Sequence, residues 1–394
     1  MTDWSTPRSS PVSLKRQHES LRSRALARNS LVRRLDWVLA FSVVMLSSLG
    51  GLLVWSATRT SSQDAFLKRH LLNFAIGLAL ASIVALVDYS MLRAYVPVVY
   101  VASCLGLIAV LSPLGSTVNG ARSWITLPAG FQIQPSEFAK VALVVGMAMI
   151  LGEKRDNESD PRDVDVLLVL ALAAVPMGLI MLQPDFGTTM VFVFTILGVL
   201  AVSGAPTRWV GGLVTAGILG GWGILHFGLL KGYQRERLTV FASKPDKADL
   251  SGAAHQVDQS VTAIGSGGMW GSGLFNGVST RGEYVPEQQT DFVFSVAGEE
   301  LGFVGSGLIL LLLIVVMYRG LRIAANAGDA FGLIVAAGVS SWFAFQIFVN
   351  VGMTMGIMPV TGLPLPFVSY GGSSMFANMM AIGLLQNVHM RSRD

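Results

Sequence analysis

Long runs of apolar residues dominate the chain from about residue 37 onward. A helix that crosses the hydrocarbon core of a bilayer needs about 20 mostly apolar residues. Runs of about this length predict ten membrane-spanning helices, at 37–57, 71–87, 94–112, 136–152, 164–183, 186–204, 208–227, 302–318, 330–350 and 368–388. The expected fold class is therefore an all-α polytopic membrane protein. Its longest connection, about 229–300, lies between the seventh and eighth spans.

Basic residues lie next to alternate ends of these spans. They occur in the N-terminal tail and in the even-numbered connections, at Arg8, Lys15, Arg16, Arg22, Arg24, Arg28, Arg33, Arg34, Arg93, Lys154, Arg155, Arg162, Arg208, Arg319, Arg322, Arg391 and Arg393. Short loops rich in lysine and arginine stay on the cytoplasmic side. Both termini are therefore expected in the cytoplasm, and the connection 229–300 outside it. Arg59, Lys68 and Arg69 are a mild exception on the outer side.

Composition supports a membrane protein and excludes some other classes. Apolar residues make up 52% of the chain and charged residues 13%, whereas soluble domains carry about a quarter charged residues. The net charge of +4 is too small to indicate a nucleic-acid surface, and the single cysteine, Cys104, excludes an intrachain disulfide. Residues 1–35 are expected to be a disordered cytoplasmic basic tail attracted to anionic lipid. Residues 36–390 are expected to form a single transmembrane domain.

The first polar segment on the expected outer side is NGARSWITLPAGFQIQPSEFAK, residues 119–140. Asn119 and Gly120 predict a turn, and Ser136 is a candidate cap for the helix that follows. Glu137 and Lys140 share one helix face and can pair. An ordinary helix start with a snorkelling lysine would explain them too, but ionisable residues at membrane depth favour a functional site.

Two further outer segments contain turn residues. In LQPDFG, Asp185 could cap the sixth span or take part in a site, and the sequence does not separate these roles. The glycines within AIGSGGMWGSGLFNG, residues 263–277, resemble a phosphate loop only weakly, because no Gly-Lys-Ser/Thr follows them. A turn whose backbone approaches a ligand or another helix is the better interpretation.

Asp291 is the strongest candidate for acid–base chemistry. It lies in Thr290-Asp291-Phe292 with apolar neighbours, and Glu299 and Glu300 follow it. A carboxylate in partly apolar surroundings is a weaker acid and can serve as a general base near neutral pH. Asp291 could equally cap a helix over 293–301.

The segment GMTMGIMPVTGLPLPFVSYGGSSM, residues 352–375, lies between the last two spans and cannot be one simple helix. Irregular backbone at membrane depth is tolerated where it is buried in protein or lines a wet cavity. We therefore expect a cavity on the outer side. Its hydrogen-bonding groups would come from Ser369, Tyr370, Ser373 and Ser374.

Several of these motifs together resemble the SEDS family, the shape, elongation, division and sporulation proteins that include RodA and FtsW. The resemblance rests on NGARSWI, FQIQPSEFAK, LQPDFGTT, YQRERL, IGSGGMWGSG, YVPEQQTDFVFSVAGEELG and GLPLPFVSYGGSSM. These motifs stand in the family's order, and the resemblance covers about residues 35–390. It implies a ten-helix bundle with a large extracytoplasmic loop after the seventh span. The phrase TMGIMPVTGLPLPFVSYGGSSM and the short C-terminal tail resemble the RodA branch more than the division branch, which often carries longer termini. The long N-terminal tail departs from this pattern.

The resemblance also implies an activity and a set of site residues. The activity is peptidoglycan glycosyltransfer, in which lipid II is polymerised during elongation and shape maintenance in partnership with a class B penicillin-binding protein. The motif positions that match the family's site are Asp291, Glu137, Lys140, Arg122, Pro364, Ser369 and Gly371. The expected location is the bacterial inner (plasma) membrane, with the active site outside the cytoplasm.

The expected mechanism makes Asp291 the general base that activates the acceptor sugar hydroxyl. Arg122 and Lys140 would steady the donor diphosphate, and a divalent cation, Mg²⁺ or Mn²⁺, could assist. Two alternatives remain. A lipid II flippase would suit the interrupted backbone at 352–368, although the ionisable residues gather on one side only. A non-catalytic activator of a penicillin-binding protein would need no base at Asp291.

Overall fold

The computed structural model describes residues 34–62, 64–118, 121–126, 132–153, 161–227 and 252–392. The expected tail up to residue 33, the Asn119–Gly120 turn and the YQRERL motif lie outside the described residues. Contacts divide the chain into Met1–Leu35 and Asp36–Asp394. The second unit contains all the helices and strands described below.

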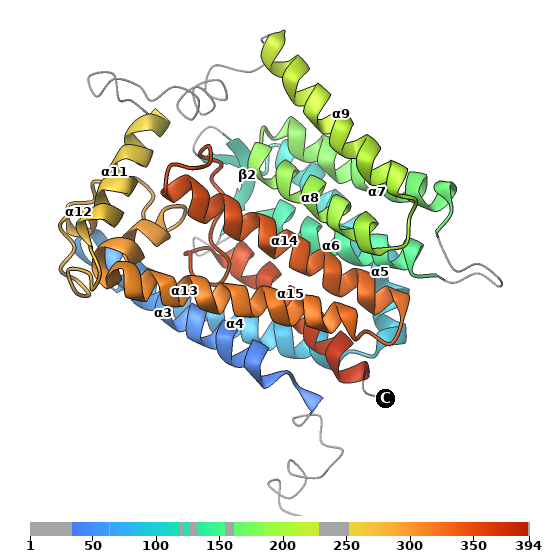
Figure 1. Ribbon diagram of the computed structural model, residues 1–394, viewed down its shortest axis with the longest axis horizontal. Helices are drawn as coiled ribbons and strands as arrows, with labels where there is room; N and C mark the ends of the chain where they lie inside the picture. Colours follow the sequence, from blue (N-terminus) through green and yellow to red (C-terminus); the bar gives the residue numbers. More distant parts are fainter. Residues whose placement is uncertain are drawn as a thin grey trace, which may run out of the picture. The chain divides into compact units, whose positions relative to one another are not determined.

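Long apolar helices form most of this unit (Figure 1). Within the described residues, ten helices have 17 or more residues: α3 (Trp37–Ser62), α4 (Ala65–Leu86), α5 (Tyr89–Leu111), α6 (Pro135–Leu151), α7 (Asp163–Leu182), α8 (Phe186–Val202), α9 (Thr207–His226), α13 (Val293–Ala325), α14 (Ala330–Thr354) and α15 (Gly372–Arg391). Each overlaps one of the ten predicted runs. Six of them, α3, α4, α5, α7, α13 and α14, are long and apolar enough to cross a membrane by length and composition. The chain is thus an all-helical polytopic membrane protein, and the count of ten crossings stays a prediction.

Helix α14 lies at the centre of the bundle. It packs against α13, α8, α6 and α15, while α15 packs along α4 and α13 along α3 (Figure 1). Most of α14 and nearly all of α6 are buried in protein. Large exposed apolar side chains concentrate on helices such as α4, α5, α7 and α13. These outer helices present the surface that lipid would cover.

Helix α15 is less apolar than the outer helices because buried polar residues on it form hydrogen bonds to a neighbouring helix. Asn387 is fully buried, and its amide donates to the carbonyls of Val84, Ala85 and Val87 at the C-terminal end of α4. Those carbonyls have no partner within their own helix. An interior helix therefore supplies the hydrogen bonds that end its neighbour.

A small antiparallel sheet follows α5, in strand order β1-β2-β3, with β1 at Gly115–Val118, β2 at Ala121–Thr126 and β3 at Gln132–Ile133. The sequence predicts a turn here but no strands. The β-branched and aromatic residues of β2, in ARSWIT, favour strands. The sheet contacts α5, α6 and α15 and brings the start of α6 towards the start of α15.

Helix α13 contains a break at Gly302, whose φ is +64°. The glycine-rich turn docks there: Ser272 and Gly273 donate their backbone N–H groups to the carbonyls of Glu299 and Glu300, and Phe303 N–H donates to the Gly268 carbonyl. A Cβ at Gly271 would overlap the Glu300 carbonyl oxygen. The glycines thus allow backbone to approach another helix, which was one of the two predicted purposes.

Candidate active site

Asp291 lies at the end of a tight turn and immediately before α13. Its N–H donates to the Glu287 carbonyl over 3.1 Å, and α13 begins at Val293 with Phe292 as the N-cap residue. The N-cap position of α13 is therefore held by Phe292 and not by Asp291. The side chain is half-buried, and its Oδ2 lies 3.5 Å from the position that a Cβ on Gly362 would occupy. The carboxylate thus faces the segment that joins α14 to α15, near a helix N-terminus that favours negative charge.

That segment, residues 355–371, is called the α14–α15 connection below. Two buried amides of α14 hold it. Asn350 Nδ2 donates to the Asp291 carbonyl over 2.8 Å and to the Leu363 carbonyl over 2.7 Å, while Gln346 Nε2 donates to the Pro364 carbonyl over 2.8 Å. Residues four apart lie on the same face of a helix. One face of α14 therefore fixes both the backbone of Asp291 and the connection opposite it.

The predicted Glu137–Lys140 pair forms in the structure and connects to the same network. Lys140 Nζ lies 2.8 Å from each Glu137 carboxylate oxygen, and both side chains are 2% exposed. Lys140 Nζ also donates to Gln346 Oε1 over 3.2 Å and lies 4.6 Å from the centre of the Trp342 ring. Removing one partner from a buried ion pair leaves an uncompensated charge, so these groups depend on one another.

Asp185 and Ser373 meet through Gln134, which precedes α6. Asp185 caps α8 by accepting from Thr188 N–H over 2.9 Å, and it also accepts from Gln134 Nε2 over 3.2 Å. The Gln134 N–H donates to Ser373 Oγ over 2.9 Å. The capping role that the sequence left open for Asp185 is confirmed. The same carboxylate helps join the starts of α6, α8 and α15.

The remaining predicted residues take structural positions around the connection. Ser369 Oγ accepts from Leu365 N–H over 2.8 Å, and the Tyr370 N–H donates to the Gln289 carbonyl over 2.9 Å. Gly371 is the N-cap residue of α15. Ser369 and Tyr370 therefore shape the connection and tie it to the turn before Asp291.

The Arg122 side chain makes its hydrogen bonds at the end of α5. Its Nη2 donates to the Ser112 carbonyl over 2.7 Å and its Nε to the Gly115 carbonyl over 3.2 Å, so the guanidinium binds backbone at the end of α5. The predicted cap at Ser136 is wrong, because α6 begins at Pro135 with Gln134 as its N-cap residue.

The acidic pair after Asp291 is buried and bonded within the fold. Glu299 accepts from the N–H groups of Ser279 and Thr280 and from Thr280 Oγ1, at 2.7, 2.9 and 2.7 Å. Glu300 accepts from Ser56 Oγ over 2.6 Å. Both are almost fully buried. Of these three carboxylates, Asp291 is the accessible one.

No group of three or more His, Cys, Asp or Glu side chains in the described part of the chain could hold a metal ion. A single carboxylate such as that of Asp291 can contribute a ligand to magnesium, which commonly binds through one or two carboxylates together with substrate phosphates. A divalent cation would fit this region only in that manner, with a phosphorylated substrate present.

Sequence reasoning missed four residues that assemble the site: Gln134, Trp342, Gln346 and Asn350. A usable signal exists for two of them. Gln346 and Asn350 are amides four apart within an otherwise apolar helix. Polar groups in such a helix face the protein interior or a cavity.

Comparisons with known proteins agree with this architecture. The sequence profile of the FtsW, RodA and SpoVE family, described as "Cell cycle protein", matches residues 29–394. Stage V sporulation protein E of Bacillus subtilis is 38% identical, with 91% of this chain and 98% of that protein covered. Peptidoglycan glycosyltransferase MrdB of Escherichia coli K12 is 34% identical, with 90% and 93% covered.

Solved structures show the same likeness. One chain comes from a structure described as "Structural coordination of polymerization and crosslinking by a peptidoglycan synthase complex". It matches with a TM-score of 0.76 and 31% identity, covering 91% of this chain and 98% of that one. The Rod shape determining protein RodA of Thermus thermophilus matches with a TM-score of 0.67 and 29% identity, covering 91% and 98%. The chain therefore belongs to the SEDS family, the family of FtsW, RodA and SpoVE.

Proposed function

We propose that this protein is a peptidoglycan glycosyltransferase that polymerises lipid II into glycan strands. The curated names of two relatives, MrdB and the FtsW protein of Trichlorobacter lovleyi, give that activity as established or probable, and both align over 90% of this chain. The observation that carries the proposal is the placement of Asp291. Its half-buried carboxylate faces the α14–α15 connection, and α14 fixes its backbone.

In the proposed reaction, Asp291 removes the proton from the acceptor sugar's 4-hydroxyl as that oxygen attacks the donor's anomeric carbon. A new carbon–oxygen bond forms, and the bond from the anomeric carbon to the diphosphate breaks. The lipid diphosphate leaves with the electron pair, so no nucleotide is needed outside the cell. A positioned base of this kind contributes about 100- to 10,000-fold in rate.

Lys140 acts through its neighbours in this proposal. The sequence suggested that Lys140 and Arg122 steady the donor diphosphate. Lys140 is buried between Glu137 and Gln346, and Gln346 in turn holds the Pro364 carbonyl. This geometry supports a positioning role for Lys140, in which it fixes the connection opposite Asp291. For Arg122, the bonds to the end of α5 support positioning of the β1–β2 hairpin.

The proposed setting follows from the basic flanks of the helices and from the relatives. Asp291 would lie outside the cytoplasm, in the bacterial inner membrane, with both termini inside. A class B penicillin-binding protein is the proposed partner, because one similar chain comes from a complex that combines polymerisation with crosslinking. Elongation and cell shape remain the proposed process. Identities of 38%, 34% and 34% to SpoVE, FtsW and MrdB do not separate the branches.

The test is glycan-strand formation from purified lipid II, with wild type and Asp291→Asn each assayed with and without a class B penicillin-binding protein. We expect strands from wild type, and at least about 100-fold slower polymerisation by the folded variant. Polymerisation is also measured after EDTA is added and after Mg²⁺ or Mn²⁺ is restored, which tests whether the reaction needs a divalent cation.

Near-normal polymerisation by Asp291→Asn would remove the base from the proposal. If neither protein makes strands with the partner present, lipid II movement across vesicles becomes the decisive assay for a flippase. Polymerisation that appears only with the partner and is unchanged in Asp291→Asn would instead favour an activator.

A further inference from the structure

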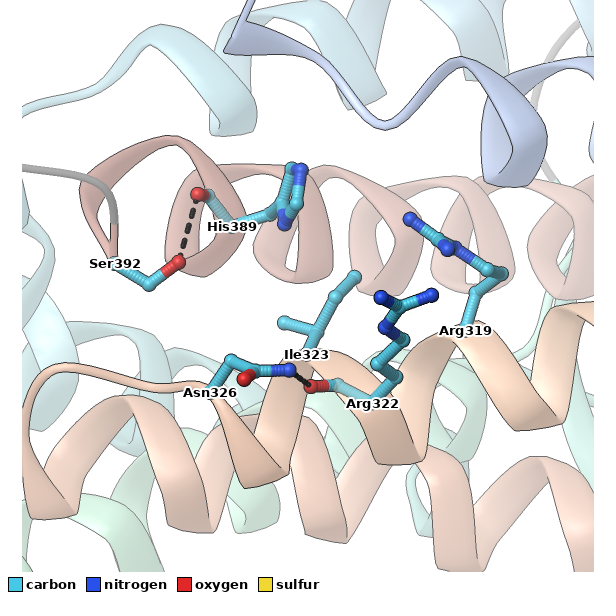
Figure 2. Close-up of a pocket in the computed structure, with 6 residues that line it drawn as sticks. All are labelled: Arg319, Arg322, Ile323, Asn326, His389 and Ser392. Carbon is cyan, nitrogen blue, oxygen red and sulfur yellow. Dashed lines mark hydrogen bonds between the residues drawn. The ribbon is translucent and has the colours of Figure 1, made fainter.

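A second polar site lies at the other end of α13. A cavity of about 490 Å³ separates the C-terminal turns of α13 and α15, and its lining residues are Arg319, Arg322, Ile323, Asn326, His389 and Ser392 (Figure 2). At a rise of 1.5 Å per residue, the part of α13 from its break at Gly302 to Arg322 is roughly 30 Å long, and Asp291 lies before that break. The cavity is therefore separate from the candidate active site.

The two arginines of this cavity differ in their bonding. Both extend from α13 towards α15 in Figure 2. Arg319 pairs with buried Asp36, to which its Nε donates over 2.6 Å, and Gln386 of α15 holds the backbone of Asp36. For the exposed Arg322 guanidinium, no ion pair or hydrogen bond is found among the described residues. Asp36 thus balances Arg319, and Arg322 gives the cavity a net positive charge.

The other lining groups suit an oxyanion. Among the described residues, the lining contains no carboxylate. One N–H of the Asn326 side-chain amide donates to the Arg322 carbonyl, and its second N–H can donate to a ligand. The buried side chain of Ile323 provides an apolar floor. Guanidinium groups bind phosphate oxygens through two parallel N–H bonds. A phosphate group therefore matches both the charge and the donors of this cavity.

The surface beside the cavity favours a lipid as the carrier of that phosphate. Tyr318 and Leu321, just before Arg322 on α13, are 59% and 54% exposed, and Ile314, one turn before Tyr318, is also exposed. Acyl chains can lie along such a row. Basic pockets between transmembrane helices commonly bind anionic head groups.

We propose that this cavity binds a phosphate group, carried by an anionic phospholipid or free in solution, with Arg322 as its principal contact. The site would lie on the cytoplasmic side in the orientation given above. Binding here requires no assumption about glycosyl transfer.

The test measures binding to the purified full-length chain in neutral detergent by the shift of its thermal unfolding midpoint. Three probes are titrated: dihexanoylphosphatidylglycerol, dihexanoylphosphatidylcholine and inorganic phosphate. The variants are Arg322→Gln and Arg322→Lys. Arg208→Gln is the matched control, because Arg208 is an exposed arginine that pairs with Asp163 outside this cavity.

We expect phosphatidylglycerol to bind wild type and Arg208→Gln alike, and Arg322→Gln at least about tenfold more weakly, since a hydrogen bond to a charged group is lost. Arg322→Lys should recover part of the affinity. Inorganic phosphate that binds with the same dependence on Arg322 would make free phosphate a sufficient ligand. Equal binding by wild type and Arg322→Gln, or equal binding of phosphatidylcholine, would overturn the proposal.

Discussion

Two carboxylates of one continuous segment, Asp291 and Glu299, have opposite surroundings. Glu299 is 2% exposed and accepts three hydrogen bonds from Ser279 and Thr280, residues of the short helix α12 (Val278–Arg281). It holds α12 against α13. Asp291 is half-buried and faces Gly362 in the α14–α15 connection, and it is the Asp291 carbonyl, not the carboxylate, that Asn350 binds.

This contrast teaches that an acidic residue in a motif is a candidate base only if a substrate can reach it. A carboxylate that is buried and bonded by its own fold stabilises that fold. The α12–α13 region is therefore expected to respond to mutation through stability. The region around Asp291 is expected to respond through polymerisation rate.

The largest effect is expected where a carboxylate is both buried and charged, at Glu137. Lys140→Met leaves Glu137 without its partner and should lower the free energy of unfolding by about 3–5 kcal/mol. The double variant Glu137→Gln/Lys140→Met should regain most of that stability, because no unpaired charge remains. Thermal unfolding measures both.

The polymerisation rate of the folded double variant tests whether the Glu137–Lys140 pair affects the active site as well as stability. Because Gln346 loses its bond from Lys140, we expect slower polymerisation than wild type even at equal stability. A double variant with wild-type rate would show that the pair only stabilises the bundle.

The next effect concerns the glycine turn that docks beside Glu299. Gly271→Ala should lower the free energy of unfolding by about 3 kcal/mol, from left-handed backbone strain and from overlap with the Glu300 carbonyl. Gly265→Ala is the control, since a Cβ at Gly265 meets no atom within 4 Å. Equal melting midpoints for the two variants would argue against tight docking.

A smaller effect, on rate, is expected at Asn350. Asn350→Leu removes the bonds to the Asp291 and Leu363 carbonyls and should slow polymerisation by about 10- to 100-fold, equivalent to one or two hydrogen bonds. Ser340→Ala, which removes a bond within α14 only, is the control. A rate per folded molecule equal to that of Ser340→Ala would leave Asn350 with a structural role alone.

The smallest effect is expected at Gly362, whose φ is +73°. Gly362→Ala should lower stability by about 1–2 kcal/mol and alter the rate, because the added Cβ would lie 3.5 Å from Asp291 Oδ2. Gly356→Ala shares the backbone conformation, with φ +72°, but its Cβ would meet Val257 instead. The rate per folded molecule should fall for Gly362→Ala only. Identical rates per folded molecule for the two variants would mean that the Asp291 carboxylate does not act next to Gly362.

The sequence predicted the helices well because long apolar runs have few other solutions in a membrane. It predicted the Glu137–Lys140 pair because both residues lie within one helical turn. It missed Gln346 and Asn350 as site residues because their partners, Pro364, Leu363 and Asp291, become neighbours only after folding. The Ser136 cap was wrong because Pro135, which suits the first helical turn, starts α6 one residue earlier.

The most direct test measures lipid II polymerisation and the thermal unfolding midpoint in parallel for wild type, Asp291→Asn and Glu299→Gln. Asp291→Asn should polymerise at least about 100-fold more slowly with its midpoint nearly unchanged. Glu299→Gln should lose about 2–3 kcal/mol of stability, because its amide cannot accept all three hydrogen bonds, while its folded fraction keeps a rate near that of wild type. The reverse pattern, with rate lost at Glu299 and retained at Asp291, would contradict the assignment of the base.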